Sequence, residues 1–195
     1  MRKFIIYIFA ICIYTSCISS NPRAISNNTT MSEEEIPFVS SPVLPYTASS
    51  PIEKGLINQF NTYVLAMRNG NVDVAKQYLY PDLFAQYPAA YKDQAYQTVV
   101  MLFENTITET EAKGFTIDCI ISDILKRISD NNRLIYVCET VMNLSGHDKF
   151  IADKSRVIAI SVNNGKSWQF LEMSEEAEHT LSLRFSKRIT SQIVE

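Results

Sequence analysis

The fold is decided by residues 155–173, SRVIAISVNNGKSWQFLEM. A β-branched, apolar run at 155–162 leads into Asn163-Asn164-Gly165, and a second apolar run follows from Trp168 to Met173. A type I′ turn needs positive φ angles, which Asn and Gly tolerate. The stretch therefore predicts two antiparallel strands joined by a hairpin turn.

Two more candidate strands lie upstream of this hairpin. In residues 115–122 the apolar side chains occupy alternate positions, and residues 134–141 are β-branched and apolar. Ser129-Asp130-Asn131-Asn132 between them is typical of a turn. We expect the second strand to end at Asn143-Leu144-Ser145-Gly146.

Three helices are predicted before the strands. The first begins at Pro51 and is stopped by Arg68-Asn69-Gly70-Asn71, with Gly70 where a left-handed cap belongs. Asn71 then caps a second helix that ends before Pro81. A third helix is expected over 89–104, with these side chains facing inward: Tyr91, Ala95, Thr98, Val99, Leu102 and Phe103.

The segment after Met173 also has helical character. Ser174 is a good N-cap, and apolar residues then recur at helical spacing: Ala177, Leu181, Phe185 and Ile189. Leu181, Leu183 and Phe185 also alternate, which leaves a strand open as the alternative. Helices followed by a run of strands indicate an α+β fold.

The order and two short motifs resemble the nuclear transport factor two-like superfamily. Residues 60–80 around Asn69-Gly70-Asn71-Val72-Asp73 look like its opening pair of helices, and residues 163–170 look like its late hairpin. The resemblance covers residues 51–173 and implies N-terminal helices packed on a curved, mainly antiparallel sheet that forms a cone, with a C-terminal helical tail added here. Some members are isomerases or dehydratases, and others are binding or assembly modules.

The resemblance implies a ligand pocket inside the cone. The expected lining is Tyr63, Phe103, Tyr136 and Trp168, and the alternative is that all four fill the core. The superfamily's isomerases use a carboxylate base and a tyrosine donor. Tyr63, Tyr136, Asp118 and Glu139 are of the right type, but no motif fixes their positions, so no catalytic residue is assigned.

The first seventeen residues resemble a bacterial lipoprotein signal. Met1-Arg2-Lys3 is basic, and residues 4–14 form an apolar run that is shorter than the roughly 20 residues needed to cross a bilayer. Thr15-Ser16-Cys17 then resembles the lipobox, although Tyr14 stands where Leu, Val or Ile is favoured. The resemblance implies a signal peptide over 1–16 and acyl chains on Cys17.

The resulting organisation is a lipid-anchored domain. Ile18 follows the cysteine, where an aspartate would resemble an inner-membrane retention signal, so an outer membrane is favoured. Residues 19–22 contain no acidic cluster resembling a surface-export signal, which favours the periplasmic face. Residues 17–50 are rich in Ser, Asn, Thr and Pro and predict a flexible tether, and residues 51–195 form a single domain. The alternative is a secreted protein with a chance cysteine near the cut.

Two cysteines remain in the domain, Cys119 and Cys138. In an exported protein such a pair could form a disulfide. A hairpin centred on Asn131-Asn132 would place residue 119 opposite about residue 144, however, and not opposite 138. We therefore favour two buried free thiols, which pack as small hydrophobes.

The remaining composition narrows the function further. Without Arg2 and Lys3 the chain has 16 basic and 21 acidic residues, a net charge of −5, which argues against nucleic-acid binding. The two histidines, His147 and His179, lack ligand spacing, so no metal site is expected. Glycine is sparse and no phosphate-binding loop is present, so no cofactor is expected.

The sequence therefore predicts a lipid-anchored envelope protein that binds a small apolar ligand or a partner protein without catalysis. An enzyme of the same superfamily, an isomerase, dehydratase or hydrolase, is one alternative, and it would be favoured by an acid that faces a tyrosine or histidine in an open pocket. A structural or assembly subunit is the other, favoured if side chains fill the cone. A homodimer is possible.

Overall fold

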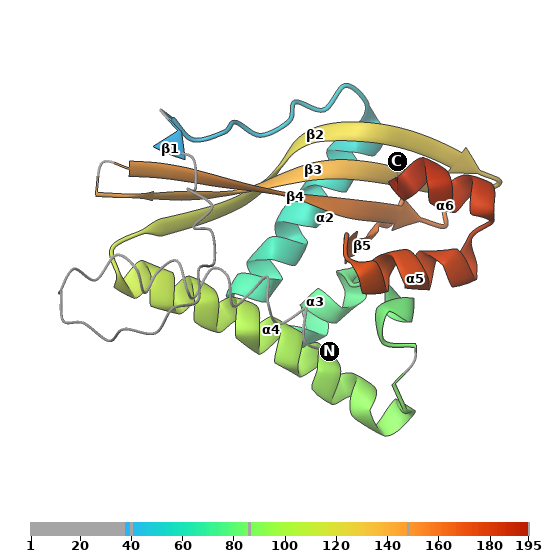
Figure 1. The fold of residues 1–195 in the computed structure, drawn as a ribbon, viewed down its shortest axis with the longest axis horizontal. Coiled ribbons are helices and arrows are strands. Elements are labelled where there is room, and N and C mark those ends of the chain that lie inside the picture. The colour runs from blue at the N-terminus through green and yellow to red at the C-terminus, as the bar shows by residue number, and fades with distance from the viewer. Residues whose placement is uncertain (1–37, 40, 86, 148, 195) are drawn as a thin grey trace, which may run out of the picture.

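The computed structural model describes residues 38–39, 41–85, 87–147 and 149–194, and in this part the chain has the predicted α+β architecture, with a curved antiparallel sheet (Figure 1). The elements in chain order are β1 (Phe38–Val39), α2 (Pro51–Arg68), α3 (Val72–Tyr78), the 3-10 helix η1 (Pro81–Phe84), α4 (Ala89–Ala112), β2 (Thr116–Asp130), β3 (Arg133–Gly146), β4 (Lys149–Ser161), β5 (Gln169–Glu172), α5 (Glu175–Arg184) and α6 (Lys187–Val194).

The predicted helix–turn–helix at the start of the domain is confirmed. Ser50 caps α2 by accepting a hydrogen bond from the Glu53 N–H, and the helix ends at Arg68. Gly70 has a φ of +63°, and the Asn71 side chain accepts a hydrogen bond from the Val74 N–H to cap α3. The left-handed glycine reverses the chain and lets α3 pack back on α2.

The sheet is built from two long hairpins. The strand order is β1-β4-β3-β2, and β5 pairs with the same edge of β4 as β1, farther along the strand. β3 continues through residues 143–146, so the predicted strand end there is wrong. β4 begins at Lys149 and pairs with β3 from Gly146 onward, which gives that segment a partner along its whole length.

Two β-bulges set the register of the β2–β3 hairpin. Near the turn Ile128 pairs with Ile135, as a turn at Asn131-Asn132 requires. The register shifts once after Ile121 and once after Ile124, so that Cys119 pairs with Met142 and not with residue 144. Each bulge places one extra residue on β2 and increases its bend.

The two faces of the sheet pack against different helices. Successive side chains of a strand point to opposite faces. The inner face, which packs against α2, carries Tyr136, Cys138, Val157, Ala159 and Phe170. The outer face, which packs against α5 and α6 at the right-hand end of the strands in Figure 1, carries Ile135, Val137, Ile158, Ile160 and Leu171.

A segment that the sequence assigns to the tether is held against the sheet. β1 pairs with β4, and residues 41–50, which we name the strap, cross the sheet to the start of α2 (Figure 1). The Asn143 side chain accepts a hydrogen bond from the Val43 N–H at 3.0 Å and donates one to its carbonyl at 2.9 Å. The Tyr46 N–H donates to the Ile121 carbonyl. The described domain thus begins before Pro51, because side-chain partners hold a segment that forms almost no secondary structure.

Cys17, the predicted signal segment 1–16 and the predicted tether as far as residue 37 lie outside the described residues.

The third helix differs from its prediction in length and in phase. α4 extends eight residues past the predicted end at 104, and its buried residues are Tyr96, Val100, Thr106, Ile107 and Thr110. Tyr91 and Thr98, predicted to face inward, are exposed. Residues 99–103 are all apolar, so hydrophobic periodicity cannot fix which side of this helix is buried.

The C-terminal segment forms two helices where a single apolar stripe was predicted. All four stripe residues are buried, but Phe185 has extended backbone angles that end α5 before α6 begins. Leu183 is helical and exposed, so the alternative of a strand is wrong.

Candidate functional site

A pocket of about 140 Å³ lies between the inner face of the sheet and the helices α2 and α4. α2 contributes Phe60 and Tyr63, α4 contributes Phe103, and β5 contributes Phe170. Tyr63 stacks on Phe170 with ring centroids 5.6 Å apart, and Phe60 meets Phe170 edge-on at 5.3 Å. These rings form an apolar aromatic wall.

The wall that the sheet contributes also carries two acids. Asp153 on β4 and Glu172 on β5 line the pocket, and Glu172 pairs with Val157, which faces the pocket four residues along β4 from Asp153. Both residues are exposed to solvent, although protein atoms surround much of the Glu172 carboxyl group. The lining residues include no lysine, arginine or histidine.

The electrostatics of this wall link the acids to the tyrosine. Burial raises the pKa of Glu172, and the charge of Asp153 raises it further. Burial also raises the pKa of Asp153, against a lowering effect of the Lys154 N–H. The pKa of Tyr63 is raised first by burial and then by the charge of Glu172, so this phenol stays neutral and can donate a hydrogen bond.

The four predicted lining residues fall into two groups. Tyr63 and Phe103 line this pocket, but Tyr136 and Trp168 do not. Tyr136 and Trp168 pack on each other with ring centroids 5.0 Å apart, in the cluster around Leu56 under the first turns of α2. They face the same side of the sheet as the pocket but lie nearer the β2–β3 turn, where the sheet and α2 are in close contact.

The carboxylates considered from residue type alone are not in the pocket. Asp118 is exposed on β2. Glu139 pairs with Lys154 and accepts a hydrogen bond from the Ser122 hydroxyl at 2.9 Å. Sequence reasoning missed Asp153 and Glu172. For Glu172 a signal existed, because a strand residue two positions after an inward Phe170 must also face inward.

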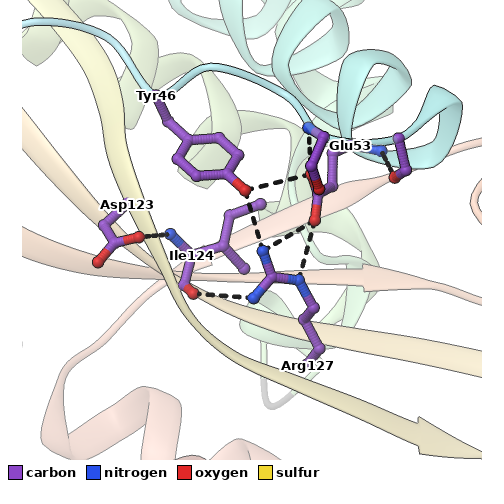
Figure 2. Close-up of polar contacts among 7 residues, drawn as sticks. Tyr46, Glu53, Asp123, Ile124 and Arg127 are labelled. Carbon is purple, nitrogen blue, oxygen red and sulfur yellow. Dashed lines mark hydrogen bonds and ion pairs between the residues drawn. The ribbon is translucent and has the colours of Figure 1, made fainter.

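A second polar cluster lies where the strap enters α2 (Figure 2). The buried Glu53 carboxylate accepts hydrogen bonds from the Ser49 N–H at 2.7 Å, the Ser49 hydroxyl at 2.6 Å and Arg127 Nε at 2.9 Å. The Tyr46 hydroxyl lies 3.2 Å from Glu53 and 3.0 Å from Arg127. Burial alone would raise the pKa of Glu53, but Ser49 and Arg127 outweigh it and lower the pKa to about 2. The side chains of this cluster bond to one another within the protein. We therefore assign the cluster a structural role, which is to join the strap, α2 and β2.

Cys119 and Cys138 are both free, as predicted, but Cys119 is half-buried where two buried thiols were expected. Cys119 lies on the pocket wall and Cys138 is fully buried, and they occupy different rungs of the β2–β3 ladder. Burial raises the pKa of each to about 12, so both are neutral thiols with little nucleophilic character.

No protein-family model matches this sequence, and no curated protein matches it. Within the described residues no group of three or more His, Cys, Asp or Glu side chains is arranged to hold a metal ion. In the same part of the chain, every helix is too short or too polar to cross a membrane.

Proposed function

We propose that this protein is a lipid-anchored envelope protein whose nuclear transport factor two-like domain binds a small, mainly apolar molecule. The observation that carries the proposal is the pocket of about 140 Å³ with its aromatic wall. Side chains do not fill this space, which argues against a purely structural spacer. The lipobox-like Cys17 and the tether supply the anchor in this proposal.

The volume of the pocket limits the size of the ligand. An apolar cavity of about 150 Å³ takes a benzene-sized molecule. The pocket opens to solvent, so a single ring with a short polar arm fits this description. Each buried apolar Å² contributes roughly 25 cal/mol, before the cost of immobilising the ligand is subtracted. We therefore expect weak binding of simple probes.

The binding proposal is tested by titrating the purified full chain with 2-phenylethanol and following its amide NMR spectrum. We expect saturable shifts confined to pocket residues such as Tyr63, Phe103 and Thr140. Val99→Phe should fill the space and abolish the shifts, because Val99 lines the pocket. The matched control is Val162→Phe, since Val162 is exposed. The binding proposal is wrong if neither 2-phenylethanol nor a charged phenyl probe of the same size shifts a pocket resonance.

The anchor is tested independently of the pocket. Intact-mass analysis of the native protein should show a chain that begins at Cys17 and carries acyl chains, and Cys17→Ala should release the protein from membranes. Two or more acyl chains give stable anchoring where one is marginal. A Cys17→Ala protein that still sediments with membranes after a high-salt wash would exclude this anchor.

One observation favours the enzyme alternative. Glu172 carries a raised pKa and acts electrostatically on Tyr63 in the same pocket, which is the arrangement of a general base beside a hydrogen-bond donor. The test is proton exchange at the methylene group of phenylacetone in D₂O. Catalysed exchange that Glu172→Gln abolishes and the exposed control Glu109→Gln retains would establish the enzyme. Exchange no faster than in buffer would exclude this chemistry for such ketones.

A further inference from the structure

The pocket has a charge imbalance that an apolar ligand alone would leave uncorrected. Asp153 and Glu172 both line it, and the lining contains no basic side chain. Among the described residues, no lysine, arginine or histidine lies within ion-pair distance of either carboxylate. Elsewhere in the domain the enclosed acid Glu53 has its arginine.

Both acids belong to the strand face that lines the pocket. Phe170 and Glu172 stand two residues apart on β5, so they face the same side. Val157 pairs with Glu172, and Asp153 lies two further alternations along β4, beyond Ser155. The strands β4 and β5 thus present, on one side, a row that passes from aromatic ring to carboxylates.

A neutral ligand in this space would reduce the solvation of the two carboxylates without neutralising their charge. An apolar group that displaces water from a carboxylate removes its solvation and supplies no hydrogen bond or ion pair to replace it. A cation in the same place forms charge-assisted hydrogen bonds with the carboxylates. The rings of Tyr63 and Phe170 add attraction for a cation, because the face of an aromatic ring carries negative charge. A bare metal ion is a poor fit, because among the described residues no three His, Cys, Asp or Glu side chains are arranged to hold one.

We infer that the ligand of this pocket is an organic cation, an ammonium group on a small apolar body, with the ammonium at Glu172 and Asp153 and the body against Phe60, Phe103 and Phe170. The inference rests on the proposed ligand-binding function and names its substrate class. Its distinctive consequence is selectivity for charge among molecules of one shape.

The test compares three probes of similar size on the purified full chain: phenethylamine, its neutral isostere 2-phenylethanol, and the anion 3-phenylpropanoate. Dissociation constants come from amide NMR titrations at pH 7. Charge-assisted hydrogen bonds are about twice as strong as neutral ones, so we expect phenethylamine to bind at least about tenfold more tightly than 2-phenylethanol. The anion should bind more weakly than either.

Variants separate the charge from the shape of the pocket. Glu172→Gln should weaken phenethylamine binding about tenfold and change 2-phenylethanol binding less than about twofold, because it removes the charge and keeps the volume. Asp153→Asn is the second variant, and Glu109→Gln, an exposed acid on α4, is the matched control.

The outcomes distinguish the inference from the function on which it rests. Preference for phenethylamine that either pocket variant removes supports the inference. Equal binding of all three probes at the pocket resonances overturns the inference and leaves the ligand-binding function standing. Absence of binding by every probe overturns the ligand-binding function itself.

Discussion

The ion pair between Glu53 and Arg127 gives the sharpest test of how the strap is held. Both groups sit where the strap, α2 and β2 meet (Figure 2), and the Glu53 side chain exposes only 4% of its surface. Glu53→Gln keeps the shape of the side chain but turns an N–H₂ group or a neutral oxygen toward donors that need an anion. We expect this variant to be clearly less stable than the wild type.

The magnitude follows from the pKa of the carboxyl. Its ordinary value of 4.5 falls to about 2 in the folded protein. At about 1.4 kcal/mol per pKa unit the shift is equivalent to about 3 kcal/mol. The two hydrogen bonds from Ser49 lower the pKa more than Arg127 does, and Arg127 exposes 44% of its side chain, so solvent screens the ion pair. For the pair alone we therefore expect a coupling of about 1 kcal/mol.

The pH dependence has a defined sign. Because the folded state lowers the pKa of Glu53, it binds the proton less readily than the unfolded chain does. The contribution is therefore fully present above about pH 4.5 and is lost as the pH falls toward 2. Glu53→Gln should remove this part of the acid dependence.

The assay is urea unfolding monitored through Trp168, the single tryptophan, which is 1% exposed. A double-mutant cycle with Glu53→Gln and Arg127→Met isolates the coupling from the other effects of each change. A coupling free energy below about 0.5 kcal/mol at pH 7, the range of an ordinary surface pair, would refute the reasoning.

Three further predictions concern stability and reactivity. Cys119 and Cys138 should react with a thiol reagent at pH 8 far more slowly in the native protein than in urea, because burial raises the pKa of both to about 12; equal rates would contradict this. Gly70→Ala should lower the free energy of urea unfolding by about 1 kcal/mol because φ is +63°, whereas Gly55→Ala inside α2 should raise it by about 0.5 kcal/mol; the same sign for both would count against the left-handed turn. Asn143→Ala should speed native-state amide exchange in the strap without altering the β4–β5 hairpin, and unchanged exchange would show that this side chain does not hold the strap.

Much of the fold was predictable because local rules decide it. Gly70 and Asn71 adopt the conformations that their residue types favour, and the β4–β5 hairpin forms around Asn164 and Gly165, both with positive φ. The connection there is longer than a two-residue turn, since the ladder stops at Ile160 and Gln169, and it is held by side-chain hydrogen bonds.

Other features depend on tertiary partners that no local pattern reveals. The two bulges in β2 follow from how the sheet curves around α2, so the turn alone gave a register that is wrong by two residues at Cys119. The strap is rich in serine and proline and has no helix or strand periodicity, and only its partners on the sheet show that it belongs to the domain.

The candidate site also combines residues that local patterns predict with residues whose place depends on tertiary packing. Tyr63 and Phe103 could be chosen as inward aromatic residues on predicted helices. Whether Tyr136 and Trp168 face a cavity or fill the core depends on where the sheet separates from α2, which the sequence does not reveal. The inward position of Glu172 follows from strand alternation with Phe170, although the sequence analysis does not assign this acid to the pocket.

The measurement that tests the central claim most directly is the diffraction of a crystal of this protein held under xenon. Xenon binds in apolar cavities without specific polar groups, so its site does not depend on knowing the ligand. We expect a xenon atom among Phe60, Phe103 and Phe170. A crystal that takes up no xenon there, with those rings closed on one another, would contradict the existence of an apolar binding pocket.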